Sequence, residues 1–456
     1  MELPTIILIP CKKYGILIPY VYLHVNNPQI TQKFCMHFWL LPIKSQTVTN
    51  NDCIAISYYI KIDYTQLIDY VLCVIIIHNS IIFFKSRLTD YLTSFNHKGG
   101  GFLIMKKILS MIFVDGFNGM AIGIFFTFSL GTILQQIGTI ISKDIGDLFI
   151  TVGGIAITLT GAGIAMGIAS KVSMPPMVTL SAALAGMIGA HADSIFESSI
   201  ITAEGAVKLN GPGDPLGACI AVLITLSIGT LIAGKTELDL LLTPVVCTTI
   251  GGICGLFFAP ASDTITRTLS RSLLWSITQN EIAMGILIAC LMCIFTMLPV
   301  STLTIIHLAM LGDISAGAAT IGCCCSMIGF AVASYRDNKI CGLVLQGIGT
   351  SKLQLANTIK RPYILLPALI SSGILGGVSA AVFKLTNTVK GAAYGTTGLL
   401  GCIKAYEDMQ KSMGSTEALI VVSLLCFVLP GVISLGVAEV LRKVKLLKDG
   451  DMKIVM

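Results

Sequence analysis

The chain has 456 residues, of which 54% are hydrophobic and 12% are charged, and its formal net charge is +6. A mean hydropathy of +0.85 exceeds what a soluble domain of this length can bury, which excludes a soluble protein. The small positive charge does not indicate a nucleic-acid partner, and the 15 cysteines form neither a metal-ligand nor a secreted-disulfide pattern. We therefore predict an all-α, polytopic integral membrane protein with no metal or other cofactor.

Residues 1–104 differ in composition from the rest of the chain. The first 98 residues contain a single glycine, Gly15, and a single alanine, Ala55, although the whole chain has 45 glycines. They show no sustained period for helix or strand, and only 68–84 is apolar enough to suggest a span. No short basic start precedes an apolar core at the N-terminus, so the sequence does not indicate a signal peptide.

The sequence around Met105 is typical of a bacterial translation start. The purine run of a ribosome-binding site can encode Lys98 and the two glycines after it, and Met105 is followed by two lysines and an apolar run. We therefore expect 1–104 to be a translated upstream region of an AT-rich genome and 105–456 to be the transmembrane domain. A lineage-specific extension that carries one extra span is the alternative.

Beyond Met105, apolar stretches of membrane-spanning length follow one another. They predict about eight to ten transmembrane helices, including re-entrant or broken segments. A polar interruption at 311–317 can divide one of these stretches into two elements. The predicted apolar stretches lie at 108–134, 146–169, 176–191, 216–234, 238–259, 282–300, 303–334, 362–383 and 416–437.

Residues 260–280 have an amphipathic pattern rather than a uniformly apolar one. Apolar residues recur at helical spacing, with Arg267 and Arg271 on another face. This pattern predicts an amphipathic helix that lies along the membrane surface or bridges two subdomains. Basic residues at both ends of 105–456 predict that both ends face the cytoplasm, the side on which short loops carry excess positive charge.

A polar segment at 191–217 separates two of the apolar stretches. It carries His191, Asp193, Glu197 and Asp214 in a chain where charged residues are scarce. Ionisable groups near membrane depth are costly unless they face a cavity or a partner, and the Gly-Pro-Gly-Asp-Pro sequence cannot form regular helix. We therefore predict a site for a polar substrate in this segment.

Several motifs, some of them rich in glycine and alanine, follow downstream. They begin at Leu298 (LPVSTLTII), Ile314 (ISAGAATIG), Gly347 (GIGTSKLQLAN), Lys360 (KRPYILLP) and Gly391 (GAAYGTTGLLG). By these motifs the chain resembles the membrane subunit, enzyme IIC, of the bacterial phosphoenolpyruvate-dependent sugar phosphotransferase system. The similarity is to a compact branch and extends over 110–440.

Two positions depart from the pattern of the relatives. Thr320 stands where asparagine is expected, and the run that begins at Lys352 replaces one richer in methionine. These differences concern substrate preference rather than the family.

The resemblance implies a multi-pass sugar permease of the bacterial cell membrane. Such a subunit binds sugar outside, carries it inward and holds it while a separate IIB subunit donates a phosphoryl group from phosphocysteine. It thereby takes part, as the membrane subunit, in protein-Nπ-phosphohistidine–sugar phosphotransferase activity. We expect separate IIA and IIB proteins as partners, together with the lipid bilayer, and a homodimer remains an open alternative because relatives are often dimers.

Phosphoryl transfer to a sugar needs an acceptor for the hydroxyl proton. Glu197 and His191 are the predicted catalytic pair, although their separation of six residues requires the segment between them to bend for contact. Either residue can instead be a polar loop or helix-end residue without a catalytic role.

Further polar residues are predicted to contact the sugar. Asp214 has a second interpretation as the N-cap of a helix whose first residue is Pro215. For the residues inside apolar surroundings, hydrogen bonding between helices is the alternative. The predicted substrate ligands are Asp193, Asp214, Asp313, Gln346 and Asn357.

Two other functions remain open at this stage. An ion-coupled secondary transporter of a small polar solute would use the same carboxylates to bind its ion. A non-transporting membrane regulator could retain the same fold.

Overall fold

The computed structural model describes residues 5–11, 16–22, 111–141, 143–202, 205–235 and 237–454. The chain divides into two units, residues 1–89 and 90–456. In the first unit, strands β1 (Thr5–Cys11) and β2 (Ile16–Tyr22) pair antiparallel, a hairpin that the irregular pattern of this region did not predict. The span suggested at 68–84 lies outside the described residues.

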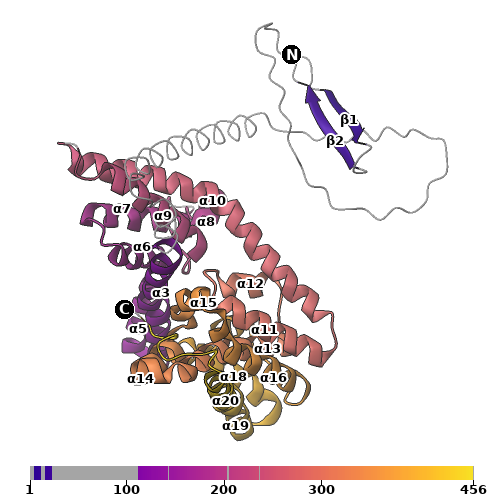
Figure 1. Ribbon diagram of the computed structural model, residues 1–456. Helices are drawn as coiled ribbons and strands as arrows, with labels where there is room; N and C mark the ends of the chain where they lie inside the picture. The colour runs from indigo at the N-terminus through magenta and orange to yellow at the C-terminus, as the bar shows by residue number, and fades with distance from the viewer. Residues whose placement is uncertain are drawn as a thin grey trace, which may run out of the picture. The chain divides into compact units, whose positions relative to one another are not determined.

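All regular elements described in the second unit are helices, so the predicted all-α polytopic fold is confirmed (Figure 1). Six described helices are long and apolar enough to cross a membrane, and a pair bent by 58°, α5 (Lys143–Thr158) with α6 (Thr160–Lys171), has the form of a broken span or a re-entrant loop. Two shorter apolar helices, α7 (Pro176–Ala190) and α11 (Glu281–Met297), accompany them. The six spans are Val114–Ile140, Pro215–Ile232, Asp239–Ile277, Asp313–Ala333, Pro362–Ala381 and Ser415–Lys443.

The first helical group consists of the helices up to α9 and the first half of α10. The run through α3 and α4 pairs with α5 and α6 as a hairpin, and α7 packs on α6, α9 and α10. The remaining elements of this group are η2 (Met111–Gly116), α3 (Phe117–Ile124), η3 (Phe125–Ser129), α4 (Leu130–Ile140), α8 (Ala192–Phe196) and α9 (Pro215–Ile232).

Glycine pairs let the two arms of this hairpin approach backbone to backbone. A Cβ atom at Gly123 would lie 2.2 Å from the carbonyl oxygen of Gly163, and one at Gly167 would lie 2.1 Å from that of Gly119. Carbon atoms in contact are normally 3.5–4.0 Å apart, so side chains larger than hydrogen cannot occupy these positions without separating the helices. The abundance of glycine in the sequence therefore reflects close helix packing, as in other membrane proteins.

Helix α10 (Asp239–Ile277) is a single element of 39 residues that runs from the first helical group to the second (Figure 1). Its first half packs on α7 and α9, and its second half contacts α11 and α12. The amphipathic helix expected at 260–280 is this second half. The sequence predicted an apolar stretch at 238–259 and an amphipathic helix at 260–280 as different segments, and in the structure one helix runs through Pro260 and contains both.

The second helical group contains α11 and all later elements, with α13 packed against α11, α16 and α20. The interruption expected at 311–317 does divide its stretch, because α12 ends at Leu308 and α13 begins at Asp313. The elements after α11 are α12 (Thr302–Leu308), α13 (Asp313–Ala333), α14 (Tyr335–Val344), η4 (Leu345–Gly349), η5 (Ser351–Gln354), α15 (Leu355–Lys360), η6 (Pro362–Leu365), α16 (Leu366–Ala381), α17 (Val389–Tyr394), η7 (Thr397–Leu399), α18 (Leu400–Met413), α19 (Ser415–Ser423), η8 (Leu424–Val428) and α20 (Leu429–Lys443).

Candidate functional site

The polar segment at 191–214 folds back onto the end of α7. The backbone N–H of Asp214 donates to the carbonyl oxygen of Ala190 at 2.7 Å, so the two ends of the segment meet. Gly213 has a φ of +68°, and a Cβ atom there would lie 2.4 Å from the same carbonyl oxygen. Only glycine fits this position, which explains one residue of the Gly-Pro-Gly-Asp-Pro sequence.

Asp214 is the N-cap of α9, as its second interpretation predicted. Its carboxylate accepts hydrogen bonds from the N–H groups of Leu216 at 3.3 Å and Gly217 at 2.8 Å, and Pro215 is the first helical residue. The hydroxyl of Ser262 on α10 also donates to this carboxylate. Burial raises the pKa of Asp214, and these hydrogen bonds oppose that increase.

We expect Asp214→Asn to keep the fold and Asp214→Ala to lower the free energy of unfolding by about 0.5–2 kcal/mol, the usual cost of an N-cap. Chemical or thermal unfolding of the two purified variants measures this difference. Sugar uptake by Asp214→Asn then distinguishes the N-cap role from direct sugar contact, because asparagine is also a favoured N-cap residue. A stable but inactive Asp214→Asn variant would contradict a role limited to capping.

An acidic cluster forms where α8 and α9 meet α10. It consists of Asp193, Glu197, Asp214 and Asp263, with Arg267 as the nearby cation. The guanidinium of Arg267 pairs with Asp263 at 2.6 Å (Nε to Oδ2). Partial burial raises the pKa of Asp193, and the negative charges of Asp214, Asp263 and Glu197 raise it further, whereas Arg267 lowers it. The segment therefore gathers more negative than positive charge.

His191 and Glu197, the predicted catalytic pair, occupy different environments. His191 is 3% exposed and hydrogen-bonds the backbone of Thr158, while its Nε2 atom is buried without a partner among the described residues. Burial lowers the pKa of His191 more than this hydrogen bond raises it. Glu197 follows α8 on the exposed surface. Within the described part of the chain, no hydrogen bond or ion pair joins the two side chains.

A second polar region lies inside the second helical group, where three interrupted segments meet. We call it the polar crossing; it consists of residues 298–301, 345–354 and 389–399. The carbonyl oxygen of Gly349 accepts hydrogen bonds from Ser129 Oγ and Thr397 Oγ1, each at 3.1 Å. Thr302 Oγ1 donates to the carbonyl oxygen of Ala393 at 3.1 Å. The irregular backbone is thus enclosed by protein, the condition under which it is tolerated at membrane depth.

Lys352 is the cation of the polar crossing. Its side chain is buried, and its Nζ donates to the carbonyl oxygens of Leu298 and of Val300, the latter at 3.4 Å. No carboxylate pairs with it among the described residues. In the sequence, Lys352 stood out only as a departure from the relatives. The signal for a functional role was present, because an ionisable residue within an apolar, glycine-rich stretch is a site candidate by default.

Gln346, a predicted substrate ligand, lies in the polar crossing and is fully buried. Its Nε2 donates to Ser334 Oγ at 2.8 Å and to the carbonyl oxygen of Gly342 at 3.0 Å. Its Oε1 is buried without a partner among the described residues, which leaves one acceptor available to a ligand.

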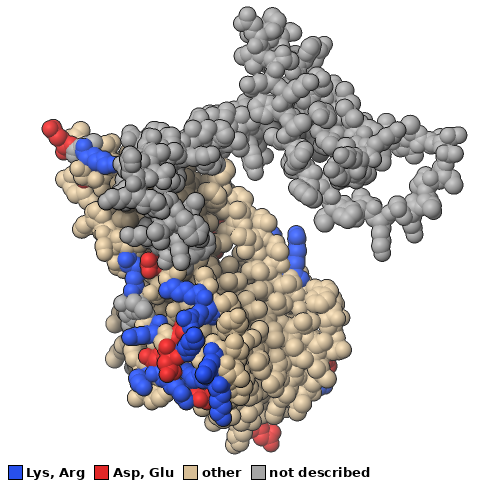
Figure 2. All heavy atoms as spheres, in the orientation of Figure 1, with Lys and Arg blue, Asp and Glu red and all other residues tan. Residues whose placement is uncertain are grey.

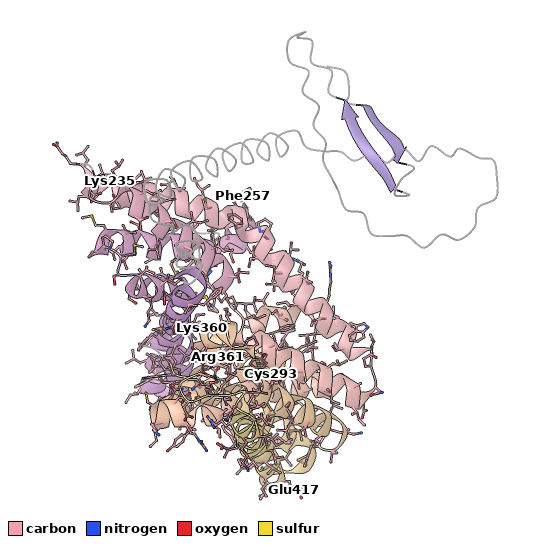
Figure 3. All side chains as sticks on the ribbon, viewed as in Figure 1. Lys235, Phe257, Cys293, Lys360, Arg361 and Glu417 are labelled. Carbon is pink, nitrogen blue, oxygen red and sulfur yellow. The ribbon has the colours of Figure 1, made fainter. Side chains whose placement is uncertain are left out.

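Asn357 instead holds the C-terminal segment. Its Nδ2 donates to Gln354 Oε1 at 2.8 Å and to the carbonyl oxygen of Lys453 at 3.0 Å. Gln354 in turn donates to the carbonyl oxygen of Met452 at 2.8 Å, and Arg361 pairs with Asp451. Arg361 and Lys360 lie at the end of α15, towards the middle of the second unit in Figure 3. Asn357 thus joins α15 to the C-terminal segment, and its role as a sugar ligand stays a prediction.

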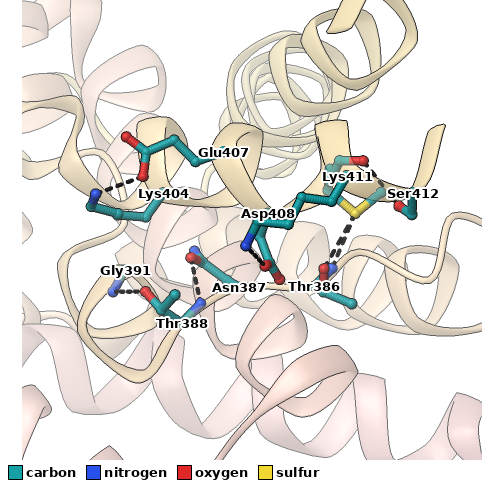
Figure 4. Close-up of polar contacts among 10 residues, drawn as sticks. Thr386, Asn387, Thr388, Gly391, Lys404, Glu407, Asp408, Lys411 and Ser412 are labelled. Atoms are coloured by element: carbon teal, nitrogen blue, oxygen red, sulfur yellow. Dashed lines mark hydrogen bonds and ion pairs between the residues drawn. The ribbon is translucent and has the colours of Figure 1, made fainter. Parts of the chain in front are cut away.

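Asp313 is exposed at the start of α13, with a φ of +47°, and its carbonyl oxygen accepts from the N–H of Asn387 at 3.3 Å. The Asn387 side chain donates to Thr320 Oγ1 at 2.8 Å and to the carbonyl oxygen of Gly401 at 3.0 Å. Figure 4 shows Asn387 beside Thr388, whose hydroxyl caps α17. Asn387 was not predicted; it fixes the loop before α17 to Thr320, one of the two positions that depart from the relatives.

Three buried thiols, of Cys324, Cys402 and Cys426, lie with their sulfur atoms within 4.8 Å of one another. Of the described residues, they are the group that could hold a metal ion. Three thiolates would place excess negative charge in the apolar core, which is costly. We therefore interpret these cysteines as small packing residues.

Comparison with known proteins shows to which family the chain belongs. No curated protein matches the chain. The family model described as "Phosphotransferase system, EIIC" matches residues 114–454, which includes the polar segment at 191–214, the polar crossing and nearly all of the second unit. The chain therefore belongs to the family of phosphotransferase-system enzyme IIC membrane subunits.

Proposed function

We propose that this protein is the sugar permease subunit of a bacterial phosphotransferase system, working in the cell membrane with separate IIA and IIB proteins. The family match over residues 114–454 is the observation that carries the proposal. Its polytopic helical architecture, with interrupted helices enclosed by protein, agrees with a transporter of a polar solute.

The sugar site is proposed to lie in the polar crossing. Gln346 supplies an unpartnered buried acceptor, and Lys352 supplies a buried cation next to the interruption between α11 and α12. Sugar hydroxyls need such donors and acceptors, and the surrounding apolar helices exclude water. Three of the five motifs by which the chain resembles enzyme IIC begin in this region, at Leu298, Gly347 and Gly391.

The acidic cluster is proposed to serve the phosphoryl transfer at the inner face, which requires the sugar to move from the polar crossing to Glu197 before its hydroxyl reacts. The oxygen of a sugar hydroxyl attacks the phosphorus of phosphocysteine on IIB, the sulfur–phosphorus bond breaks, and the cysteine leaves as a thiolate. The Glu197 carboxylate accepts the hydroxyl proton. Its exposure supports this role, because an exposed group remains accessible to a sugar and to a docking protein.

The Glu197→Gln variant should therefore lose about 10²- to 10⁴-fold in sugar phosphorylation, the usual contribution of a general base, while sugar binding is retained. The assay measures sugar phosphate formed in membrane vesicles supplied with phosphoenolpyruvate and the soluble components. Glu417→Gln is the matched control, because Glu417 is an exposed carboxylate on α19. If Glu197→Gln phosphorylates the sugar at the wild-type rate, Glu197 is not the proton acceptor.

An ion-coupled secondary transporter is the second candidate. The excess of carboxylates over cations in the acidic cluster favours it, since such a cluster can bind a proton or a sodium ion. Dependence of sugar accumulation on an ion gradient, rather than on phosphoenolpyruvate, distinguishes this candidate.

We also propose that translation starts at Met105. The family match begins at residue 114 and leaves 1–104 outside it, which supports this start. N-terminal sequencing of protein expressed from the native gene should yield a sequence that begins at Met105. A peptide from within residues 1–97 would contradict the proposal and favour an N-terminal extension.

A further inference from the structure

A small cavity lies between the two helical groups, where α15 contacts α3 (Figure 1). Its volume is about 200 Å³, less than the roughly 300–1,000 Å³ of sites for drug-sized molecules, so it suits a small ligand or one group of it. Both helical groups contribute to its lining. The polar lining residues are Asp115, Asn118 and Lys171 from the first group and Asn357, Lys360 and Lys453 from the second.

The charges of this lining favour an anion. Three ammonium groups, of Lys171, Lys360 and Lys453, and one carboxylate, of Asp115, give it a charge of +2. Within the described part of the chain, neither Lys360 nor Lys453 forms an ion pair with a carboxylate. A phosphate monoester carries a charge of about −1.5 to −2 at pH 7 and accepts charge-assisted hydrogen bonds from ammonium groups. Its charge therefore matches that of the lining.

The lining on the side of the second group is held in place by hydrogen bonds. Asn357 Nδ2 donates to the carbonyl oxygen of Lys453 at 3.0 Å, and the N–H of Ile454 donates to Asn338 Oδ1 at 2.8 Å. These contacts fix the C-terminal segment so that Lys453 lines the same cavity as Lys360. Because this backbone is already ordered, a ligand loses less free energy to the ordering of its site.

The cavity lies at the ends of membrane-spanning segments. One span begins at Val114 in its lining, α6 ends at Lys171, and another span begins at Pro362, two residues after Lys360. Figure 2 shows that lysine and arginine side chains gather, with some acidic ones, around α14 and the C-terminal segment. Since basic residues near span ends predict the cytoplasmic side, we expect soluble cytoplasmic anions to reach the cavity.

We propose that this cavity binds the phosphate group of a sugar phosphate, the product of the proposed transfer reaction, and that the bound product slows further uptake. The proposal rests on the proposed function. Leu353 lines the cavity and directly follows Lys352, so the cavity adjoins the polar crossing in which the sugar is proposed to bind.

The position of the cavity between the helical groups explains how the product would slow uptake. A phosphate group in the cavity is shared by Lys171 of the first group and by Lys360 and Lys453 of the second. A ligand favours the arrangement to which it binds best, here the one in which both sides of the lining meet. The transported sugar, in contrast, must move from the polar crossing of the second group to Glu197 of the first.

Binding is measured by thermal unfolding of the full-length protein in detergent, because a ligand of the folded state raises the unfolding temperature. The protein is titrated with glucose 6-phosphate, fructose 6-phosphate, N-acetylglucosamine 6-phosphate, inorganic phosphate or phosphatidylglycerol in mixed micelles. The double variant Lys360→Gln/Lys453→Gln removes two exposed cations of the lining. The matched control is Lys445→Gln/Lys448→Gln, which removes two exposed lysines of a different basic cavity, beyond the end of α20.

We expect at least one hexose phosphate to stabilise the wild type and the control at lower concentrations than inorganic phosphate does. The lining variant should bind it about 25-fold more weakly, about fivefold for each ammonium group, because an exposed ion pair contributes up to about 1 kcal/mol. Equal affinities of the lining variant and the control would overturn the site. Inorganic phosphate or phosphatidylglycerol that stabilises the wild type better than every hexose phosphate would overturn the sugar phosphate as the ligand.

The effect on uptake is measured in vesicles preloaded with the hexose phosphate that binds best. Sugar uptake should be slower in preloaded vesicles for the wild type and the control, and unchanged for the lining variant. Equal slowing of all three proteins would overturn the regulatory role. Absence of sugar phosphorylation in empty vesicles would overturn the proposed function instead, whereas the titration requires no transport and tests the cavity independently.

Discussion

We expect the Gly123→Ala variant to lose most of its stable folded protein in detergent, whereas Gly436→Ala unfolds at or above the wild-type temperature. The added methyl group at Gly123 would lie 2.2 Å from the carbonyl oxygen of Gly163, and its three nearest neighbours are all backbone atoms. Overpacking of this kind costs about 1–3 kcal/mol or more when the backbone must move. No flexible side chain stands among these nearest neighbours that could give way.

Gly436 is the matched control for this substitution. It lies in α20, and no atom of a neighbouring element lies within 4 Å of the position that a Cβ atom would take, so alanine there meets open space. Alanine in a helix is favoured over glycine by about 1 kcal/mol, which predicts a neutral or stabilising effect. Thermal unfolding monitored by size-exclusion chromatography compares the variants. Similar unfolding temperatures would contradict the backbone-to-backbone packing of α3 on α6.

Replacement of Lys352 by methionine should reduce sugar uptake about tenfold or more. The substitution keeps an unbranched side chain, one atom shorter, but removes the Nζ that donates to the carbonyl oxygens of Leu298 and Val300. Each buried carbonyl left without a donor costs about 1–3 kcal/mol, and about 1.4 kcal/mol is a factor of ten in an equilibrium. The interruption between α11 and α12 would then lose the contact that fixes it to residues 345–354.

Lys384→Met tests whether any lysine has this effect, because Lys384 is exposed in the loop after α16. Uptake in vesicles is normalised to the amount of inserted, monodisperse protein, so a folding defect is counted separately. We expect normal uptake by Lys384→Met. Full uptake by Lys352→Met would show that the polar crossing does not depend on this cation.

The sequence predicted the helical class and the polar interruptions because both follow from local composition. Stretches of apolar residues fix the spans, and the polar run at 311–317 fixes the division between α12 and α13. The continuity of α10 through Pro260 was not predictable in the same way. Near Pro260 the helix contacts residues much earlier in the chain: Ser262 donates to Asp214, and the first half of α10 packs on α7 and α9.

The sequence predicted the structural role of one residue of the candidate site, Asp214, but not how the polar residues are arranged. The capping role of Asp214 was visible in the sequence Asp-Pro at the start of an apolar run. His191 is buried between α7 and α8, whereas Glu197 is exposed after α8. The six-residue spacing of the two residues does not specify this difference. Asn387 was missed because its partner Thr320 lies far away in the chain, whereas Lys352 was missed although an ionisable residue in an apolar stretch indicates a site.

Sugar uptake by vesicles that contain the wild-type protein tests the central proposal most directly. The vesicles are offered a panel of radiolabelled sugars with or without phosphoenolpyruvate and the soluble IIA and IIB components. A phosphotransferase permease predicts that one sugar accumulates as its phosphate only when the phosphoryl donor and IIB are both present. Accumulation of unmodified sugar driven by a proton or sodium gradient alone, without phosphoenolpyruvate or IIB, would contradict this function.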